Sequence, residues 1–291
     1  MRLVNAGLKI DVITSNSSKL FCDKEQFLYE YIPDLTIDSL PNGGKPDFII
    51  ELNVSKSNSF DIIDNVIMIR YSEDCSIKDV VTLLEYGLEY CRQSKGVYCL
   101  HGSAVTKNQR AIVFVGQVSG IGKTSISLEL ALKHGYLFLG DEKILLRYIN
   151  NQPFIKSTNR LKFNKPYLGD YFRINEADFI NRFGNVTKNW IPLTLLVQPQ
   201  ICPKGALLYE KFNHTKTEFH LYEEITRKIR GCSRRVKNFT EPLLSIDDYA
   251  LSQKRSSFCK ELSLVVDSYH VVGDKSLVAS FLDDLLNKGD A

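Results

Sequence analysis

The residues best suited to chemistry lie close together in the sequence, between positions 113 and 142. This stretch holds a glycine-bearing loop that ends in Lys123 and Thr124, and it closes with the carboxylates Asp141 and Glu142. Glycines let backbone N–H groups approach an anion closely, and a lysine ammonium adds a mobile positive charge. A threonine hydroxyl and carboxylates are oxygen ligands that suit Mg²⁺. The stretch therefore predicts a site for a phosphorylated ligand and a divalent metal ion.

The local structure that would position these residues also follows from the sequence. The apolar run at residues 111–115 predicts a buried strand, and residues 123–135 predict a helix whose free N–H groups face the loop. A second strand over residues 136–139 leads to the acidic pair. This order is typical of a nucleotide-binding P-loop. The predicted nucleotide contacts are Ser119, Gly120, Ile121, Gly122, Lys123, Thr124 and Ser125.

The loop departs from the usual P-loop spacing in one respect. The usual loop has four residues between its first glycine and the Gly-Lys pair. Here five residues separate Gly116 from Gly122, so either the loop carries one extra residue or Gln117 stands where glycine is usual. A chance match in a tight turn is the alternative interpretation, but the flanking strand, helix and acidic pair favour a phosphate loop.

Residues 97–145 resemble the HPr kinase family, whose members are P-loop kinases related in fold to phosphoenolpyruvate carboxykinase. The matching pieces are His101-Gly102, the segment SGIGKT at residues 119–124, the helix ending at His134-Gly135, and the pair Asp141-Glu142. The resemblance implies an α/β fold with a P-loop kinase core, a mixed sheet and flanking helices. The family's second half carries an RGLG-like segment that this sequence lacks, so roles tied to that segment stay unassigned.

The acidic pair allows two interpretations. The resemblance implies that Asp141 takes the proton from an acceptor hydroxyl, that Glu142 and Thr124 lie at the metal, and that His101 lies near the phosphates. In many P-loop ATPases the aspartate instead holds the metal and the glutamate positions a water. Asp141 follows Lys123 by only 141 − 123 = 18 residues, which favours the kinase interpretation. A solvated acidic turn and a structural histidine are the plain alternatives. Lys123, Asp141 and His101 are the predicted catalytic residues.

Composition narrows the classes of function. The chain has 291 residues, of which 44% are apolar and 24% charged, as in ordinary globular proteins. Lys and Arg exceed Asp and Glu by 37 − 34 = 3, which argues against bulk nucleic-acid binding. No run is apolar enough for a signal peptide or a membrane span. The seven cysteines include no CxxC pair, so we expect free thiols in a cytoplasmic protein.

The remaining sequence predicts further strands and helices around this core. Residues 1–95 are predicted to form an N-terminal α/β region that can pack on the core, and residues 96–291 the P-loop kinase domain. In the first region we expect strands at residues 8–14, 47–53 and 65–71, and a helix at residues 76–93 with Ser76 as N-cap. In the second we expect strands at residues 191–197, 206–212, 218–222 and 262–266, a short helix at residues 175–183, and a last helix with Asp274 as N-cap and Leu277, Phe281 and Leu285 as its apolar stripe.

Basic side chains gather at residues 227–237. A solvated face is the commoner explanation of such a run. The functional interpretation is a dock for an acidic peptide, or a contact to a phosphate group. On that interpretation the predicted substrate residues are Arg160, Arg227, Arg230, Arg234 and Arg235.

These predictions converge on an ATP-dependent kinase that uses Mg²⁺ and resembles HPr kinase. It would move the γ-phosphoryl group of ATP to a hydroxyl, by family analogy a serine of a peptide or small protein, or of a peptide natural-product precursor. The alternatives are a small-molecule kinase, and a P-loop ATPase or a non-catalytic nucleotide-binding regulator. No nucleic-acid or membrane partner is expected. The acceptor, the preferred phosphoryl donor and a homo-oligomeric state stay open.

Overall fold

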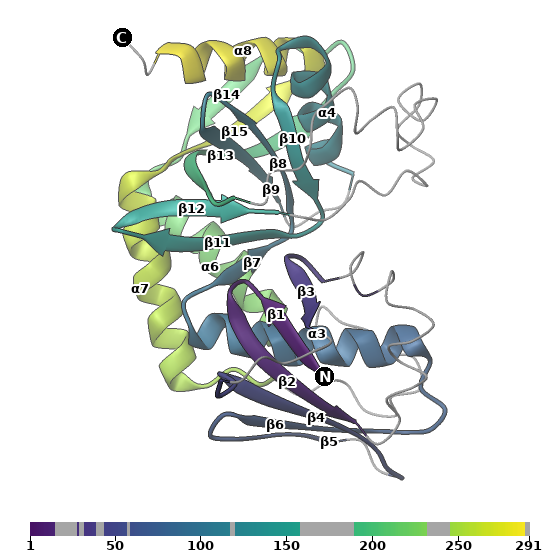
Figure 1. Cartoon of the computed structure of the whole chain (residues 1–291). Helices are drawn as coiled ribbons and strands as arrows, with labels where there is room; N and C mark the ends of the chain where they lie inside the picture. The colour runs from purple at the N-terminus through teal and green to yellow at the C-terminus, as the bar shows by residue number, and fades with distance from the viewer. Residues whose placement is uncertain are drawn as a thin grey trace. The chain divides into compact units, whose positions relative to one another are not determined.

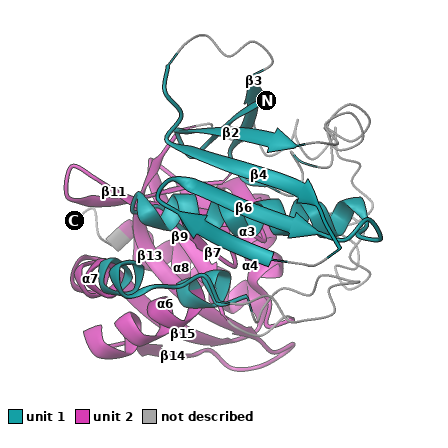
Figure 2. Cartoon of the chain, turned by 90° about the horizontal axis from the view of Figure 1, so that it is seen from below, with its two compact units in different colours: residues 1–98, 225–255 teal, residues 99–224, 256–291 magenta. Residues whose placement is uncertain are grey.

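Two β-sheets organise the chain in the computed structural model, which describes residues 1–14, 28, 32–38, 44–56, 59–116, 120–157, 189–231 and 245–288 (Figure 1). The chain divides into two compact units, Met1–Tyr98 with Ile225–Arg255 and Cys99–Glu224 with Ser256–Ala291 (Figure 2). The mixed sheets and their helices confirm the predicted α/β class in this coarse form. The predicted domain boundary between residues 95 and 96 stays a prediction.

The first unit is built on a sheet whose described strands run in the order β3-β1-β2-β4-β6-β5. Their bounds are β1 Arg2–Asn5, β2 Leu8–Thr14, β3 Leu35–Asp38, β4 Phe48–Val54, β5 Ser59–Ile63 and β6 Val66–Tyr71. β2, β4 and β6 are parallel, whereas β1, β3 and β5 pair antiparallel with their neighbours. The three strands predicted in this region are confirmed to within one residue at each end.

Helix α3, Ile77–Ser94, packs on this sheet. Its predicted N-cap is confirmed, because the Ser76 hydroxyl accepts from the N–H of Asp79 at 3.2 Å and the Asp79 carboxylate accepts from the N–H of Ser76 at 3.1 Å. Gly87 faces the sheet, and a Cβ there would be in ordinary van der Waals contact with the Ile50 Cδ1 atom at 3.4 Å. The interface buries apolar side chains from both layers, among them Leu52, Ile67, Ile69, Leu83 and Leu84.

A buried network of charged side chains ties α3 into the first unit. Arg92 is fully buried, and its Nη2 atom donates to Glu85 at 2.9 Å and to Glu89 at 2.7 Å. Its Nη1 atom donates to the Asn5 side chain at 2.9 Å, which links the helix to β1. Charges in a low-dielectric interior are tolerated only when their partners are present, because no water replaces a lost partner.

Replacing Arg92 by leucine should therefore destabilise the protein by about 3–5 kcal/mol, because Glu85 and Glu89 lose their shared cation inside the core. Urea denaturation measures the loss. Arg70→Leu is the matched control, because its ion pair with Asp61 is exposed and should contribute less than about 1 kcal/mol. Equal losses in the two variants would show that the buried network adds nothing beyond a surface pair.

The second unit is built on a larger mixed sheet with the order β10-β8-β9-β13-β12-β11-β7, in which β15 also pairs with β13 and β14. The bounds are β7 Tyr98–Leu100, β8 Gly102–Lys107, β9 Arg110–Val115, β10 Leu137–Asp141, β11 Ile144–Ile149, β12 Gln152–Lys156, β13 Ile191–Ile201, β14 Leu208–Lys211 and β15 Asp267–Gly273. β13 pairs parallel with both β9 and β15. The carboxyl ends of these strands therefore share one edge of the sheet.

Helices α4, Lys123–Lys133, and α8, Lys275–Lys288, cover one face of this sheet. Asp274 caps α8 as predicted, because its Oδ1 atom accepts from the N–H of Ser276 at 2.9 Å. The predicted apolar stripe needs correction, since Leu277 is 49% exposed. The residues of α8 most deeply buried against the sheet and α4 are instead Val278, Ala279, Leu282 and Leu286.

Two of the predicted strands are wrong. Residues 218–222 lie in helix α6, His214–Ile229, and residues 262–266 lie mostly in helix α7, Tyr249–Val265. Buried positions at 217, 221, 224 and 225 in α6, and at 258, 259 and 262 in α7, follow helical spacing rather than strand alternation. The predicted helix at residues 175–183 lies outside the described residues. None of the helices in the described ranges is both long and apolar enough to span a membrane.

Candidate functional site

The site is built at the carboxyl edge of the larger sheet, where β9 ends at Val115 and α4 begins at Lys123. Gly122 occupies the N-cap position with φ of 103° and has no side chain that could cap the helix. The first turn of α4 contains no acidic residue. The N–H groups and the positive dipole end of α4 are therefore suited to an anion. Residues 117–119, which include the predicted contact Ser119, lie outside the described residues.

Two glycines give this loop its path. A Cβ at Gly116 would lie 2.3 Å from the Ile121 Cδ1 atom, and a Cβ at Gly122 would lie 2.2 Å from the Ile201 Cγ1 atom. The N–H of Ile201 donates to the carbonyl oxygen of Ile121 at 3.0 Å, which ties the loop to the end of β13. Close packing as well as backbone conformation requires Gly122, because the Cβ atom of Ile201 would also lie 2.8 Å away. At Gly116 the contact is with the movable end of the Ile121 side chain, and the positive φ of 153° is the stronger reason for glycine.

Gly122→Ala should destabilise the protein by at least about 2 kcal/mol, because a positive φ and a steric clash with Ile201 act together. Gly120→Ala is the control, because Gly120 also has a positive φ, 85°, but a Cβ there would meet no atom within 4 Å. It should cost only about 1 kcal/mol. Urea denaturation of both variants separates backbone strain from packing, and identical losses would contradict the packing argument.

Lys123 joins the two ends of the loop. Its Nζ atom donates to the carbonyl oxygen of Gly116 at 3.1 Å, and the residue is only 8% exposed. The side chain therefore folds back across the loop instead of extending into solvent. An ammonium held there is suited to the outer phosphates of a nucleotide bound in the loop.

Thr124 and Asp141 meet directly. The Thr124 hydroxyl donates to the Asp141 Oδ1 atom at 2.9 Å, and Asp141 is 3% exposed. The pairing of β10 with β8 shifts register between Phe138 and Gly140, so Leu139 is an extra residue in the ladder. Bulges of this kind re-aim side chains beside functional sites, and this one precedes Asp141 by two positions.

Glu142 and His101 form the next part of the site. Glu142 has φ of 73°, and the N–H of Lys143 donates to the carbonyl oxygen of Asp141 at 2.9 Å, which closes a three-residue turn around Glu142. The His101 Nδ1 atom lies 3.2 Å from the carbonyl oxygen of Glu142 and 3.6 Å from its carboxylate. Because a carbonyl oxygen only accepts, we assign the proton of this contact to Nδ1. His101 therefore lies at the acidic pair.

Two residues beside the site have positioning roles that the sequence did not assign. Gly102 runs so close to β9 that a Cβ would lie 2.5 Å from the carbonyl oxygen of Phe114. The buried Ser103 hydroxyl lies 2.8 Å from the Ser127 hydroxyl and 3.2 Å from the carbonyl oxygen of Gly140, and so links β8, α4 and β10. A single serine in a strand carries no sequence signal for such a role.

The structure brings together the predicted residues Lys123, Thr124, Asp141, Glu142 and His101. Arg160, Arg234 and Arg235 lie outside the described residues. Arg227 lies in the last turn of α6, and Arg230 directly follows that helix. Both belong to the first unit, whereas the loop belongs to the second. Their role toward an acceptor stays a prediction.

Comparisons with known proteins find little. No protein-family model and no curated protein matches the chain. Among solved structures it is similar to the HPr(Ser) kinase/phosphatase from Coxiella burnetii, with 13% sequence identity and a TM-score of 0.31, over 66% of this chain and 99% of that one. A likeness of this size is a distant structural relationship and carries no argument about chemistry.

Proposed function

We propose that this protein is an ATP-dependent phosphotransferase that moves the γ-phosphoryl group to a hydroxyl. The observation that carries the proposal is the convergence of three groups at the start of α4. Lys123 reaches back across the loop, the Thr124 hydroxyl contacts Asp141 at 2.9 Å, and the helix presents its uncapped N-terminus beside them. Cation, hydroxyl, carboxylate and free N–H groups are the parts that phosphoryl transfer requires.

The residues also fit Mg²⁺. Thr124 and the acidic pair supply hydroxyl and carboxylate oxygens, and Mg²⁺ usually takes one or two protein carboxylates together with phosphate oxygens and water. We assign Thr124 and Glu142 as its protein ligands. When bound, Mg²⁺ neutralises charge on the phosphate oxygens during transfer.

We assign the acceptor's proton to Asp141. The hydrogen bond from Thr124 holds the carboxylate through Oδ1, and Oδ2 is the oxygen that we assign to the acceptor hydroxyl. His101 orients Glu142 through the contact at the turn. The acceptor that we favour is a serine of a peptide or small protein, and the protein would work in the cytoplasm.

The contact between Thr124 and Asp141 also favours a second function. A hydroxyl and a carboxylate that share a hydrogen bond are close enough to ligate one metal ion together. Asp141 would then hold the metal and Glu142 would position a water, which makes the protein an ATPase.

An ATP turnover assay with and without candidate acceptors tests the proposal. Radiolabelled γ-phosphate should appear on a serine-containing peptide or small protein when Mg²⁺ is present. Release of inorganic phosphate at the same rate with and without every acceptor would favour the ATPase instead. Absence of nucleotide binding would contradict both the phosphotransferase and the ATPase proposals.

The basic segment gives a test of the acceptor's character. If residues 227–237 dock an acidic acceptor, replacing Arg234 and Arg235 by alanine should raise the KM for the acceptor about tenfold, since two attractive charges are lost. The salt dependence of KM should also flatten, because salt screens the attraction that was removed. Arg70→Ala, a surface change outside the segment, is the control. An unchanged KM would show that the basic segment is a solvent-exposed face with no role in binding the acceptor.

A further inference from the structure

Strand β14 forms one edge of the larger sheet. Among the described strands it pairs with β15 alone, and Figure 2 shows it at the margin of the second unit. All four of its residues are exposed, with Leu208 65% and Tyr209 61% exposed. Backbone N–H and C=O groups on the open side of an edge strand can pair with a strand of another molecule. β14 is therefore a candidate interaction surface, and we call its open side the β14 edge.

The pairing with β15 decides which backbone groups face the β14 edge. The N–H of Phe212, the residue after the strand, donates to the carbonyl oxygen of Ser268 at 2.9 Å. In an antiparallel ladder every second residue bonds to the neighbouring strand and the residues between them do not. Tyr209 and Lys211 are the residues between, given the register of β14 with β15. Their N–H and C=O groups therefore point outward, where a second strand would bond.

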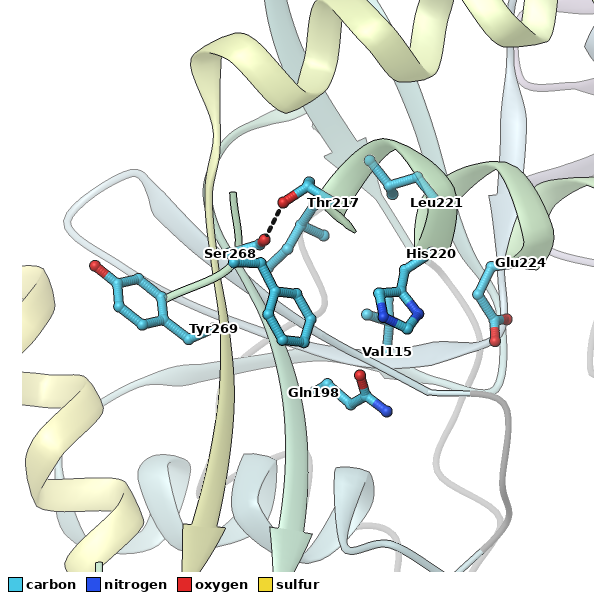
Figure 3. A pocket seen from close by; sticks show the side chains of 10 residues that line it. Val115, Gln198, Thr217, His220, Leu221, Glu224, Ser268 and Tyr269 are labelled. Atoms are coloured by element: carbon cyan, nitrogen blue, oxygen red, sulfur yellow. Dashed lines mark hydrogen bonds between the residues drawn. The ribbon is translucent and has the colours of Figure 1, made fainter. Parts of the chain in front are cut away.

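β14 is supported on both faces of the sheet. On one face the Tyr209 ring stacks on the Phe281 ring of α8, with centroids 4.5 Å apart. On the other face α6 is anchored to β15 by the hydrogen bond between the Thr217 and Ser268 hydroxyls, beside a small and mostly apolar pocket (Figure 3). The edge strand is thus already formed, so a partner strand does not have to order it on binding.

The position of the β14 edge argues against the phosphoryl acceptor as its partner. Asp141 ends β10, which lies at the far end of the strand order β10-β8-β9-β13-β15-β14. Neighbouring strands lie about 4.8 Å apart, so five spacings separate β10 from β14 by about 24 Å. A chain paired with β14 is therefore not held with its hydroxyl at Asp141.

A second copy of the chain fits the β14 edge, because β14 pairs with itself in one favourable register. Two copies related by a two-fold axis would run β14 antiparallel to its counterpart. Outward-facing residues must meet, and only registers centred on Tyr209 or Glu210 then pair most of the strand. Centring on Glu210 places two carboxylates directly opposite each other, which is destabilising. Centring on Tyr209 pairs two aromatic rings, sets Leu208 opposite Glu210 and keeps the contact of Glu210 with Lys216, so charge selects this register.

Helix α8 extends the contact beside the two-fold axis. Leu277 is 49% exposed and lies one turn before Phe281, the residue on which Tyr209 stacks. A strand of four residues is small against the about 800 Å² per partner of a standard interface. We therefore expect a weak dimer, with a Kd of about 10 μM.

We propose that two copies of this chain form a two-fold symmetric dimer in which β14 pairs with β14 and Tyr209 lies at the axis. The dimer joins the two larger sheets into one continuous sheet and removes the open edge from each copy. The proposal goes beyond the proposed function and does not depend on it, because the β14 edge carries none of the residues assigned to phosphoryl transfer.

Sedimentation velocity of the full chain at about 1–100 μM tests the dimer. The wild-type protein should shift from the mass of one chain toward the mass of two as its concentration rises. Tyr209→Lys should raise the Kd of the dimer at least about tenfold, because it removes the aromatic pair and places two ammonium groups at the axis. Phe219→Lys is the matched control, since Phe219 is also 61% exposed but lies on α6. It should leave the Kd unchanged.

Cysteine cross-linking tests the register. The Cα atoms of a bonded antiparallel pair lie about 5.5 Å apart, within the range of a disulfide. Mild oxidation of Tyr209→Cys should therefore link two copies at position 209, which mass spectrometry of the linked peptides identifies. Lys211→Cys should not link to itself, because the two copies of position 211 lie about 13 Å apart along the strands in this register.

Three outcomes would overturn the proposal. The first is a wild-type chain that stays monomeric over the whole concentration range. The second is a dimer whose Kd is the same in Tyr209→Lys and Phe219→Lys, since such a dimer would use another surface. The third is a cross-link at position 211 without one at position 209, which would show that β14 does not pair about Tyr209.

Discussion

Replacing Lys123 by methionine is expected to lower phosphoryl transfer by at least about 10²–10³-fold, the scale for losing one preorganised donor to a developing charge. Methionine keeps the apolar stem but removes the ammonium that donates to the Gly116 carbonyl oxygen at 3.1 Å. The substituted loop loses both the hydrogen bond between Lys123 and Gly116 and its positive charge, so affinity for Mg-ATP should fall too. Steady-state transfer assays and calorimetric titration measure the two effects.

Lys133→Met is the matched control for this prediction. Lys133 lies at the other end of α4, its side chain is 58% exposed, and it pairs with Glu129 at 2.7 Å. Its replacement should leave transfer unchanged, and the buried Glu129 carboxylate keeps its contacts with Lys275 and Ser276. If Lys123→Met transferred phosphate at the wild-type rate, the loop would have no part in the mechanism.

Asp141→Asn is expected to preserve nucleotide binding and to lower transfer to the acceptor by about 10²-fold or more, the usual effect of losing a general base. The amide oxygen of asparagine can still accept the hydrogen bond from Thr124, so the local structure should survive. What is lost is the basic oxygen that takes the proton. Acceptor phosphorylation, ATP affinity and thermal unfolding of the variant measure these three effects separately.

Glu142→Gln separates the kinase from the ATPase. In the kinase, this variant should need more Mg²⁺ for half-maximal transfer, because a proposed metal ligand has lost its charge. In the ATPase, Glu142→Gln would bind ATP and leave it unhydrolysed. Asp141→Asn would instead be the variant that needs more Mg²⁺, because Asp141 would hold the metal ion. Both variants keep side-chain size, and the three-residue turn around Glu142 depends on the backbone contact from Lys143 to Asp141. Trapped ATP at Glu142→Gln, with no acceptor ever labelled, would sink the kinase proposal.

Signals confined to a few consecutive residues were predicted correctly. Ser76 and Asp274 are N-caps because their side chains bond to N–H groups two or three positions away. The strand and helix around the loop follow from an apolar run and from helical spacing. Each of these features is decided by neighbours in the sequence, so no knowledge of the fold was needed.

The two wrong strands have one physical cause. Residues 218–222 and 262–266 are short windows in which strand and helix patterns look alike. Their helical state is decided by burial over the whole length of α6 and α7, as with Thr217 and Leu221 in the first and Phe258 and Leu262 in the second. A window of five residues does not sample enough turns to show that spacing.

The sequence by itself determined the chemical parts of the site and their order, since glycines, Lys123, Thr124 and the acidic pair lie within one strand-loop-helix-strand unit. Tertiary structure decided how those parts meet. The contact between Thr124 and Asp141 depends on β10 pairing with β8 through a bulge, and Gly122 is required by Ile201, which lies 79 positions (201 − 122) further along the chain. Contacts between distant segments arise only when the chain folds, so a local pattern does not reveal them.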